Sequence, residues 1–317
     1  MSWALVDNRE FALDPDWVWY DEALSSDILP ENPMPNPSAQ LKPKKKKSHL
    51  ARHPHVIWKE VHRSTYLDEI CRFAGRGNFR SLTDCPDCKA RAESEPSAAE
   101  YHCEECFMPD LTCKLCCIHR HKMQPLHRIQ LWNGTHFTMV SLKSLGLKVQ
   151  LGHTSLFCEN PLPCHTSLCI LHVNGIHEVA FNYCGCSRAI PQHLQLLRHC
   201  FFPASQLIVK TCASFELLDV LHKFALTTKA STYDFYRALE KLTDNTGLSR
   251  PKSRYHSLFR IIMQWCHLKL LKWGGRAHDP EGVDATKPGE LALNCPSCPY
   301  PGINLPDGWE HAPTGVW

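Results

Sequence analysis

The sequence predicts an α+β protein built around bound metal: a zinc-stabilised module, then a small β-hairpin region with its own zinc ligands, then a helical region. Three observations lead to this prediction. Many of the cysteines come as C-x-x-C and C-x-C doublets, a spacing that suits metal sites better than disulfide frameworks. An Asn-Gly pair between two apolar stretches indicates a hairpin. Several segments after residue 190 have helical periodicity and helix-stop signals.

The cysteine content favours zinc in a reducing compartment. The chain has 18 cysteines in 317 residues, which indicates either disulfides in a secreted protein or zinc in an intracellular one. Residues 1–17 contain no apolar signal region and no cleavage site, and no run of 18 apolar residues occurs. We therefore expect bound Zn²⁺ and no membrane association, with a disulfide framework as the alternative.

Charge is unevenly distributed along the chain. Residues 1–32 contain eight acidic residues and one arginine, a net charge of −7, whereas the whole chain carries +3. The rest of the chain therefore carries about +10, which favours a polyanionic partner such as nucleic acid. An ordinary solvated surface is the alternative interpretation of so modest an excess.

Residues 1–54 are predicted to form a disordered tail that is acidic and aromatic first, and rich in proline and lysine afterwards. Its lysine block is typical of a nuclear import signal or of an arm that touches DNA, although four lysines alone are a weak motif. We accordingly predict a nuclear location. The candidate nucleic-acid contacts in this block are Lys44, Lys45, Lys46 and Lys47.

Residues 55–190 are predicted to be the cysteine-cluster, zinc-binding region. A short amphipathic helix over residues 64–75 opens it, with Ser64 as the N-cap, Cys71 on the apolar side and Gly75 as the stop.

Three C-x-x-C pairs and the histidines after them supply enough ligands for two zinc ions. We predict an interleaved cross-brace, because each ion then joins two distant segments that a small core could not hold together. The first site would use Cys85, Cys88, Cys113 and Cys116. The second would use Cys103, Cys106, His121 and His127, with Cys117 and His119 left over and His119 as the alternative to His121. This alternating order resembles the ZZ and B-box zinc modules.

A β-hairpin is predicted over residues 168–183, with Asn174-Gly175 as a type I′ turn and partners whose numbers sum to 349. Cys184 and Cys186 would follow at its open end, opposite Cys164 or His165, as half of a third zinc site. The favoured other half is His153 and Cys158, and the alternatives are Cys164 and His165. Buried thiols on a sheet are the metal-free alternative.

Residues 191–275 are predicted to be helical. The expected helices are Gln192–His199, Phe215–Leu226, one opened by a capping box at Ser231 and ending near Gly247, and Tyr255–Trp273. The buried side of the last helix is predicted to comprise Leu258, Ile261, Ile262, Trp265, Leu268 and Leu271. Its end also carries three candidate phosphate contacts, or else a solvated basic face: Lys269, Lys272 and Arg276.

Residues 276–317 are predicted to be rich in loops. Cys295 and Cys298 form half of a further zinc site. Candidate partners are His278, Cys266, His267 or residues beyond the end of the chain. The sequence contains no P-loop, no G-x-S-x-G and no H-E-x-x-H. We therefore expect no enzymatic activity and no small-molecule substrate.

The combined motifs are similar to the CxC2-like cysteine cluster domain associated with the KDZ (Kyakuja–Dileera–Zisupton) transposases of fungi. The resemblance spans roughly residues 55–310 and depends on the motifs together rather than on any one C-x-x-C pair. The strings that carry it include CRFAGRG, RHKMQPLHRIQLWNG, LKSLGLKVQLGH, NGIHEVAFNYCGC, QLLRHCFFPAS and STYDFYRALEKLTDNTG.

The resemblance implies a zinc-rich region that precedes a ribonuclease-H-like DDE transposase core. In the family an L-G-H string, a following cysteine and the C-x-C doublet recur, which supports His153, Cys158, Cys184 and Cys186 as one site and marks Cys164 as a local extra. The segment Asn304–Trp309 leads into the catalytic core of family members, and this chain ends a few residues later. The resemblance thus implies a portion truncated before its catalytic carboxylates.

The function implied is zinc-dependent DNA binding at transposon ends, or assembly, without chemistry of its own. A ZZ- or B-box-like module that binds protein partners is one alternative. A decayed element without a present function is the other.

Overall fold

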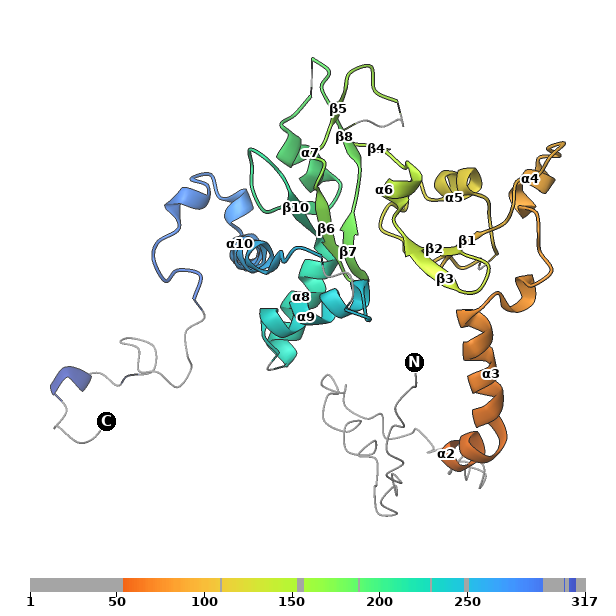
Figure 1. Ribbon diagram of the computed structural model, residues 1–317. Coiled ribbons are helices and arrows are strands. Elements are labelled where there is room, and N and C mark those ends of the chain that lie inside the picture. The colour runs from red at the N-terminus through yellow and green to blue at the C-terminus, as the bar shows by residue number, and fades with distance from the viewer. Residues whose placement is uncertain are drawn as a thin grey trace, which may run out of the picture. The chain divides into compact units, whose positions relative to one another are not determined.

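The computed structural model describes residues 54–108, 110–152, 157–187, 189–228, 230–247, 251–292, 305 and 308–311 (Figure 1). The predicted disordered tail lies outside these ranges, apart from Pro54. So do the following predicted site residues: the lysines of residues 44–47, His153, Cys295 and Cys298. The described structure is mixed α and β, as predicted. By its internal contacts the chain divides after Asp68 into two compact units.

The described part of the first unit is helical. α2 (Pro54–Ile57), η1 (Trp58–His62) and α3 (Arg63–Ala74) follow one another without a break. Ser64 therefore lies inside a helix, and the predicted N-cap there is wrong, because no glycine or proline between residues 55 and 63 stops the helix. The predicted end before Gly75 is confirmed. Cys71, predicted to be buried, is exposed.

A small antiparallel sheet follows in the second unit. Its strands β1 (Tyr101–Cys103), β2 (Ile129–Trp132) and β3 (Phe137–Val140) pair in that order. Ile129 is fully buried at its centre. The helices of this region are η2 (Gly77–Phe79), α4 (Pro86–Ala90), α5 (Lys114–Arg120) and α6 (Leu142–Leu145).

Two further sheets complete the second unit. The larger has the order β7-β6-β10-β9, in which β6 and β10 are parallel and the other pairs antiparallel. The smaller has the order β4-β8-β5. Their bounds are Val149–Gln150 (β4), Pro161–Pro163 (β5), Cys169–His172 (β6), Gly175–Glu178 (β7), Phe181–Cys184 (β8), Phe201–Pro203 (β9) and Thr211–Ser214 (β10).

The larger sheet has a buried core on each face. Along β6 and β10 successive side chains alternate in direction: Leu171 and Ala213 join the core made with the helices, while Ile170 and Cys212 join the other. The sequence predicted only helices in residues 191–275. β9 and β10 lie within that range and correct this prediction. Strands of three and four residues are too short to show a period.

The four helices predicted after residue 190 are present, and three match their predicted bounds within about one residue, whereas the third ends at Thr243 instead of near Gly247. They are α7 (Gln192–Arg198), α8 (Phe215–Thr227), α9 (Thr232–Thr243) and α10 (Tyr255–Trp273). Ser231 and Asp234 form the predicted capping box. On α10 the predicted buried side is correct except for Leu268, which is exposed. No described helix is long and apolar enough to cross a membrane. Three short helices, η3 (Arg276–His278), η4 (Val283–Ala285) and η5 (Trp309–His311), complete the described elements.

The predicted register of the hairpin is wrong. His172 pairs with Gly175 and Ile170 with His177, so partners sum to 347 and the turn is Val173-Asn174. The cause lies outside the hairpin. A Cβ on Gly175 would lie 3.1 Å from Oγ1 of Thr243 on α9, so Gly175 sits in a packed strand instead of an exposed turn. The N–H of Ile176 donates to the same oxygen at 2.8 Å.

The hairpin contains a pH-sensitive group. Burial, with a smaller effect of His172, lowers the pKa of His177 to about 4. Below its ordinary pKa of about 6.5, the unfolded chain binds a proton that the folded chain does not, so stability falls as pH drops. We expect His177→Gln to remove up to about 3 kcal/mol of the stability loss between pH 6.5 and pH 4, measured by urea unfolding. Equal acid losses in both proteins would contradict this.

Candidate metal centres

The first and third C-x-x-C pairs lie together as a buried group of four thiols. Sγ of Cys88 lies 3.7 Å from Sγ of Cys113 and 3.7 Å from Sγ of Cys116. All four sulfurs, including that of Cys85, lie within 4.8 Å of one another. A tetrahedron with metal–sulfur bonds of about 2.3 Å has edges of about 3.8 Å. The four thiols therefore have the spacing of a closed tetrahedral metal site.

Two short helices place these thiols. Cys85 and Cys113 are the N-cap residues of α4 and α5, so Cys88 and Cys116 each lie in a first helical turn. Between the two helices, Arg120 of α5 donates to Asp87 of α4 at 2.7 Å.

Arg91 adds a positive charge beside the first group. Its Nη2 lies 3.0 Å from Sγ of Cys116 and 3.6 Å from Sγ of Cys88. Four thiolates around one divalent ion leave a net charge of −2, which this guanidinium partly balances.

The second group consists of Cys103, Cys106, His121 and His127, whose ligand atoms lie within 4.8 Å of one another. Nε2 of His121 is 3.4 Å from Sγ of Cys106, and Nδ1 of His127 is 3.4 Å from Sγ of Cys103. His121 thus joins the group, whereas its alternative His119 is exposed.

The two histidines have the protonation that a metal needs. Nδ1 of His121 lies 2.7 Å from the carbonyl oxygen of Cys117, so it carries the proton and leaves the Nε2 lone pair to face the group. Burial lowers the pKa of both His121 and His127. Both shifts favour the neutral ring, which is the form that binds a metal.

The second group is tied to the hairpin through Glu105, one of the two residues between Cys103 and Cys106. Oε2 of Glu105 accepts the backbone N–H of Arg128 at 2.7 Å. Oε1 accepts from Nε of Arg128 at 2.9 Å and from Nδ2 of Asn174 at 3.0 Å. Although burial acts to raise the pKa of Glu105, these hydrogen bonds lower it. The carboxylate therefore fixes the ligand loop and docks the hairpin turn on it.

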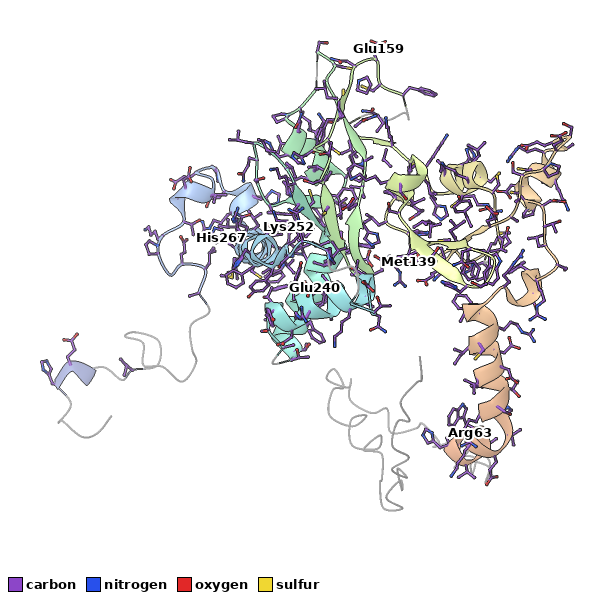
Figure 2. All side chains as sticks on the ribbon, in the orientation of Figure 1. Arg63, Met139, Glu159, Glu240, Lys252 and His267 are labelled. Atoms are coloured by element: carbon purple, nitrogen blue, oxygen red, sulfur yellow. The ribbon has the colours of Figure 1, made fainter. Side chains whose placement is uncertain are left out.

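The third group contains Cys158, Cys184 and Cys186, with Sγ of Cys158 3.7 Å from Sγ of Cys186. Cys184 ends β8, and Cys158 precedes β5 beside exposed Glu159 (Figure 2). Cys184 pairs with Pro161, not with Cys164 or His165 as the predicted register required. The predicted fourth ligand, His153, lies outside the described residues.

Cys164 and His165, the alternatives, have other roles. Sγ of Cys164 accepts the backbone N–H of Phe181 at 3.2 Å, and Nδ1 of His165 accepts that of Ser167 at 3.0 Å. Neither joins the third group.

Sequence reasoning missed Gln195, a buried residue of α7 that holds the third group in place. Its Oε1 accepts the backbone N–H of Cys184 at 2.8 Å. Its Nε2 donates to the carbonyl oxygens of Cys184 and Ile190 at 2.9 Å and 2.8 Å. The neighbouring positions on its helix face are Gln192, Arg198 and His199. The sequence therefore contained no signal for this role.

Replacing Gln195 by leucine is therefore expected to destabilise the protein by about 2–4 kcal/mol, because buried backbone groups lose their partners. It is also expected to weaken metal binding at the third group, measured by competition with a chromogenic chelator. His193→Leu, on the same helix, is the control. Unchanged metal affinity would show that Gln195 does not support the group.

The predicted nucleic-acid contacts within the described residues differ in whether they already have an acidic partner in the chain. Lys272 is exposed near the end of α10. His267, earlier on the same helix, is also exposed (Figure 2). Lys269 instead forms an ion pair of 2.8 Å with Asp219 and lies over the ring of Trp265. Arg276 is only 16% exposed and pairs with Asp279 and Glu290. Lys269 and Arg276 thus already have acidic partners within the chain.

The described donor sets suit a metal ion. One group has four cysteines, one has two cysteines and two histidines, and one has three cysteines. None of the described cysteines forms a disulfide. Thiolate with imidazole in tetrahedral spacing is the donor chemistry of structural zinc sites.

Comparison with known proteins identifies one family. The family model of the CxC2-like cysteine cluster associated with KDZ transposases matches residues 142–247, which include Cys158, Cys184 and Cys186. No curated protein and no solved structure matches the chain. This match is to the family that the sequence suggested, but it covers residues 142–247 instead of the expected range of roughly 55–310.

Proposed function

We propose that this chain is a zinc-binding, DNA-binding and assembly module of a KDZ-type transposable element, with no chemistry of its own. The observation that carries the proposal is the third thiol group, because it lies within the range matched by the transposase-associated family. A module of this kind would act in the nucleus, beside the catalytic core of a transposase.

Zinc is the metal we propose for all three groups. The first group, with four buried cysteines, and the second, with two cysteines and two neutral imidazoles, satisfy its preference for four soft or borderline donors. These two groups would then form a ZZ- or B-box-like cross-brace, because the second C-x-x-C pair lies between the two pairs of the first group.

DNA is the partner we propose, on the basis of charge. Outside the acidic first 32 residues the chain carries about +10. Residues 44–47 and Lys272 remain candidate contacts, whereas Lys269 and Arg276 are weakened candidates because of their acidic partners.

The proposal is tested with the full chain purified under reducing conditions with zinc. Binding to a labelled DNA duplex is followed by fluorescence anisotropy as the salt concentration is raised, and repeated after chelation. We expect an affinity that falls steeply with salt and is lost with the metal. Absent or salt-independent binding would refute the DNA-binding part. Capture of peptides without affinity for nucleic acid would favour a protein-interaction module instead.

A further inference from the structure

A hollow lined by arginines opens beside the first β-sheet. It has a volume of about 700 Å³, and its lining includes Arg72 of α3, Arg76, Arg80 and Trp132 of β2. None of the described residues that line it is acidic. We call this feature the arginine hollow. Arg72 is paired with Glu69, whereas Arg76 and Arg80 have no ion pair among the described residues, and their guanidinium groups form an anion-binding surface.

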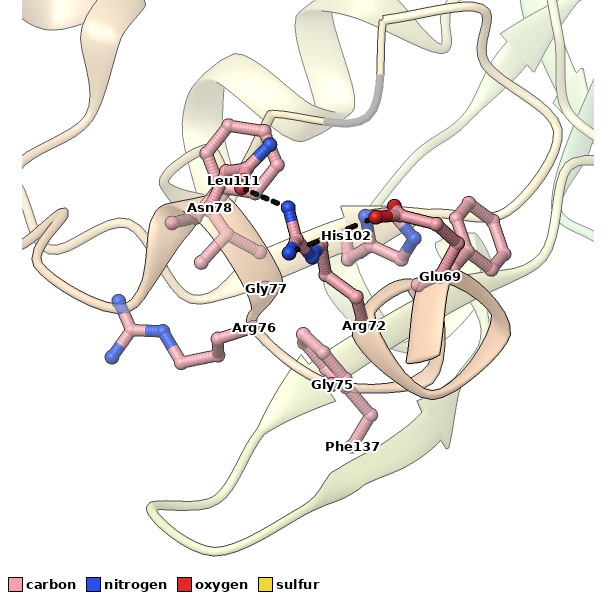
Figure 3. A pocket seen from close by; sticks show the side chains of 11 residues that line it. Glu69, Arg72, Gly75, Arg76, Gly77, Asn78, His102, Leu111 and Phe137 are labelled. Carbon is pink, nitrogen blue, oxygen red and sulfur yellow. Dashed lines mark hydrogen bonds and ion pairs between the residues drawn. The ribbon is translucent and has the colours of Figure 1, made fainter. Parts of the chain in front are cut away.

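Two of the three arginines of the hollow, Arg72 and Arg76, are held in place by contacts with neighbouring groups. Nη1 of Arg72 donates to Oδ1 of Asn78 at 3.2 Å, and Arg72 also contacts Glu69 across 3.7 Å (Figure 3). The guanidinium of Arg76 donates to the carbonyl oxygen of Leu82 and lies 5.6 Å from the centre of the Trp132 ring. Nε of Arg76 is buried without a hydrogen-bond partner among the described residues.

Gly77 makes this arrangement possible. Its φ is +45°, and a Cβ there would lie 2.7 Å from Cγ of Arg72 and 2.8 Å from its carbonyl oxygen. The chain therefore reverses tightly against α3. This turn brings Arg80 to the same hollow as Arg72.

An apolar pocket adjoins the arginine hollow and shares Arg72 and Arg76 with it. We call it the aromatic pocket; its volume is about 250 Å³. The rings and apolar side chain in its lining are Phe73, Phe79, His102, Leu111 and Phe137. The centre of the His102 ring lies 5.8 Å from that of Phe73, which meets it edge-on, and 5.5 Å from that of Phe137, so the three rings are neighbours. Figure 3 labels His102 and Phe137 among the residues that line the pocket.

From these two neighbouring features we infer a binding site for a single strand of nucleic acid. The phosphates would lie in the arginine hollow, and one unstacked base would enter the aromatic pocket. Positive grooves combined with aromatic platforms bind single strands because every base has a flat face. A duplex keeps its bases inside the stack and cannot offer one to the pocket. The inference deepens the proposed DNA binding and rests on it.

The test uses the zinc-loaded full chain with three probes of equal length: oligothymidylate, oligouridylate and a blunt-ended duplex. Arg76→Gln with Arg80→Gln removes two charges from the hollow, and Phe73→Leu removes one ring from the pocket while keeping its apolar character. Lys223→Gln with Lys241→Gln, two exposed lysines on α8 and α9, is the control of equal charge. Zinc content and thermal unfolding establish that each variant is folded.

We expect the wild-type chain to bind a single strand more tightly than the duplex. The double arginine variant should bind it about ten-fold more weakly, with a salt slope smaller by about 0.7 for each lost phosphate contact. Phe73→Leu should weaken single-strand binding about five-fold and leave duplex binding unchanged. Tight binding of oligothymidylate supports the inference, and the oligouridylate probe shows whether the site also accepts ribose.

Three results would overturn the inference, and they separate it from the proposed function. If the wild-type chain binds DNA with a steep salt dependence and the arginine variant does so equally, the hollow is not the site but the proposed function stands. Preference for the duplex over both single strands overturns the inference alone. No binding to any probe overturns both.

Discussion

Replacing Cys88 and Cys116 by serine is expected to lower the zinc content from three ions to two and to unfold the segment that these cysteines join. Among the described residues, the buried cluster at this place consists of four cysteines: Cys85, Cys88, Cys113 and Cys116. Without a metal, these residues provide no other apolar core between α4 and α5, and the ion pair of Arg120 with Asp87 is what remains. The apparent binding free energy of a structural zinc ion, about 10–16 kcal/mol, is comparable with the stability of a whole domain.

Elemental analysis under reducing conditions gives the zinc content, and limited proteolysis reports the unfolding. New cleavage should appear between residues 89 and 102, a polar stretch that the first group holds at one end. Cys71→Ser with Cys200→Ser is the matched control, since both thiols are exposed and belong to no group. A double variant of Cys88 and Cys116 that keeps three ions and resists protease would disprove a structural metal at this group.

Metal-ligand spacing could be predicted from the sequence because it is local. A C-x-x-C pair brings two thiols close together whatever surrounds it. The sequence therefore left undecided only which pairs in distant segments share a metal. The structure groups the described ligand atoms as the spacing suggested, and it groups His121 rather than His119. The helix cap could be predicted for the same reason, because Ser231 and Asp234, three residues apart, form the capping box that begins α9.

Interactions between distant segments were not predictable in this way. The hairpin register depends on Thr243, which is far away in the sequence and contacts Gly175 and Ile176. β10 joins the larger sheet because it pairs in parallel with β6, a strand far from it in the sequence. Gln195 supports the third group by hydrogen bonds to the backbone of Cys184, and contacts with the backbone leave no pattern in the sequence.

Replacing His153 by alanine is expected to lower the zinc content from three ions to two. The third group offers three thiols among the described residues, and a closed structural zinc site needs a fourth ligand. Gly152, the residue before His153, lies against this group: a Cβ on Gly152 would be 3.0 Å from Cβ of Cys184. Its backbone N–H donates to Nε2 of His199 at 3.2 Å.

Loss of a direct ligand should weaken zinc binding by more than the 10- to 100-fold typical of losing an outer partner, so the ion is lost during purification. His165→Ala is the matched control, because His165 was the alternative ligand and its Nδ1 instead accepts the backbone N–H of Ser167. Three retained ions in the His153 variant would exclude this histidine. Two ions in the His165 variant would support the alternative ligand set, in which Cys164 and His165 complete the site. The structure disfavours that set, because Cys158 lies beside Cys186.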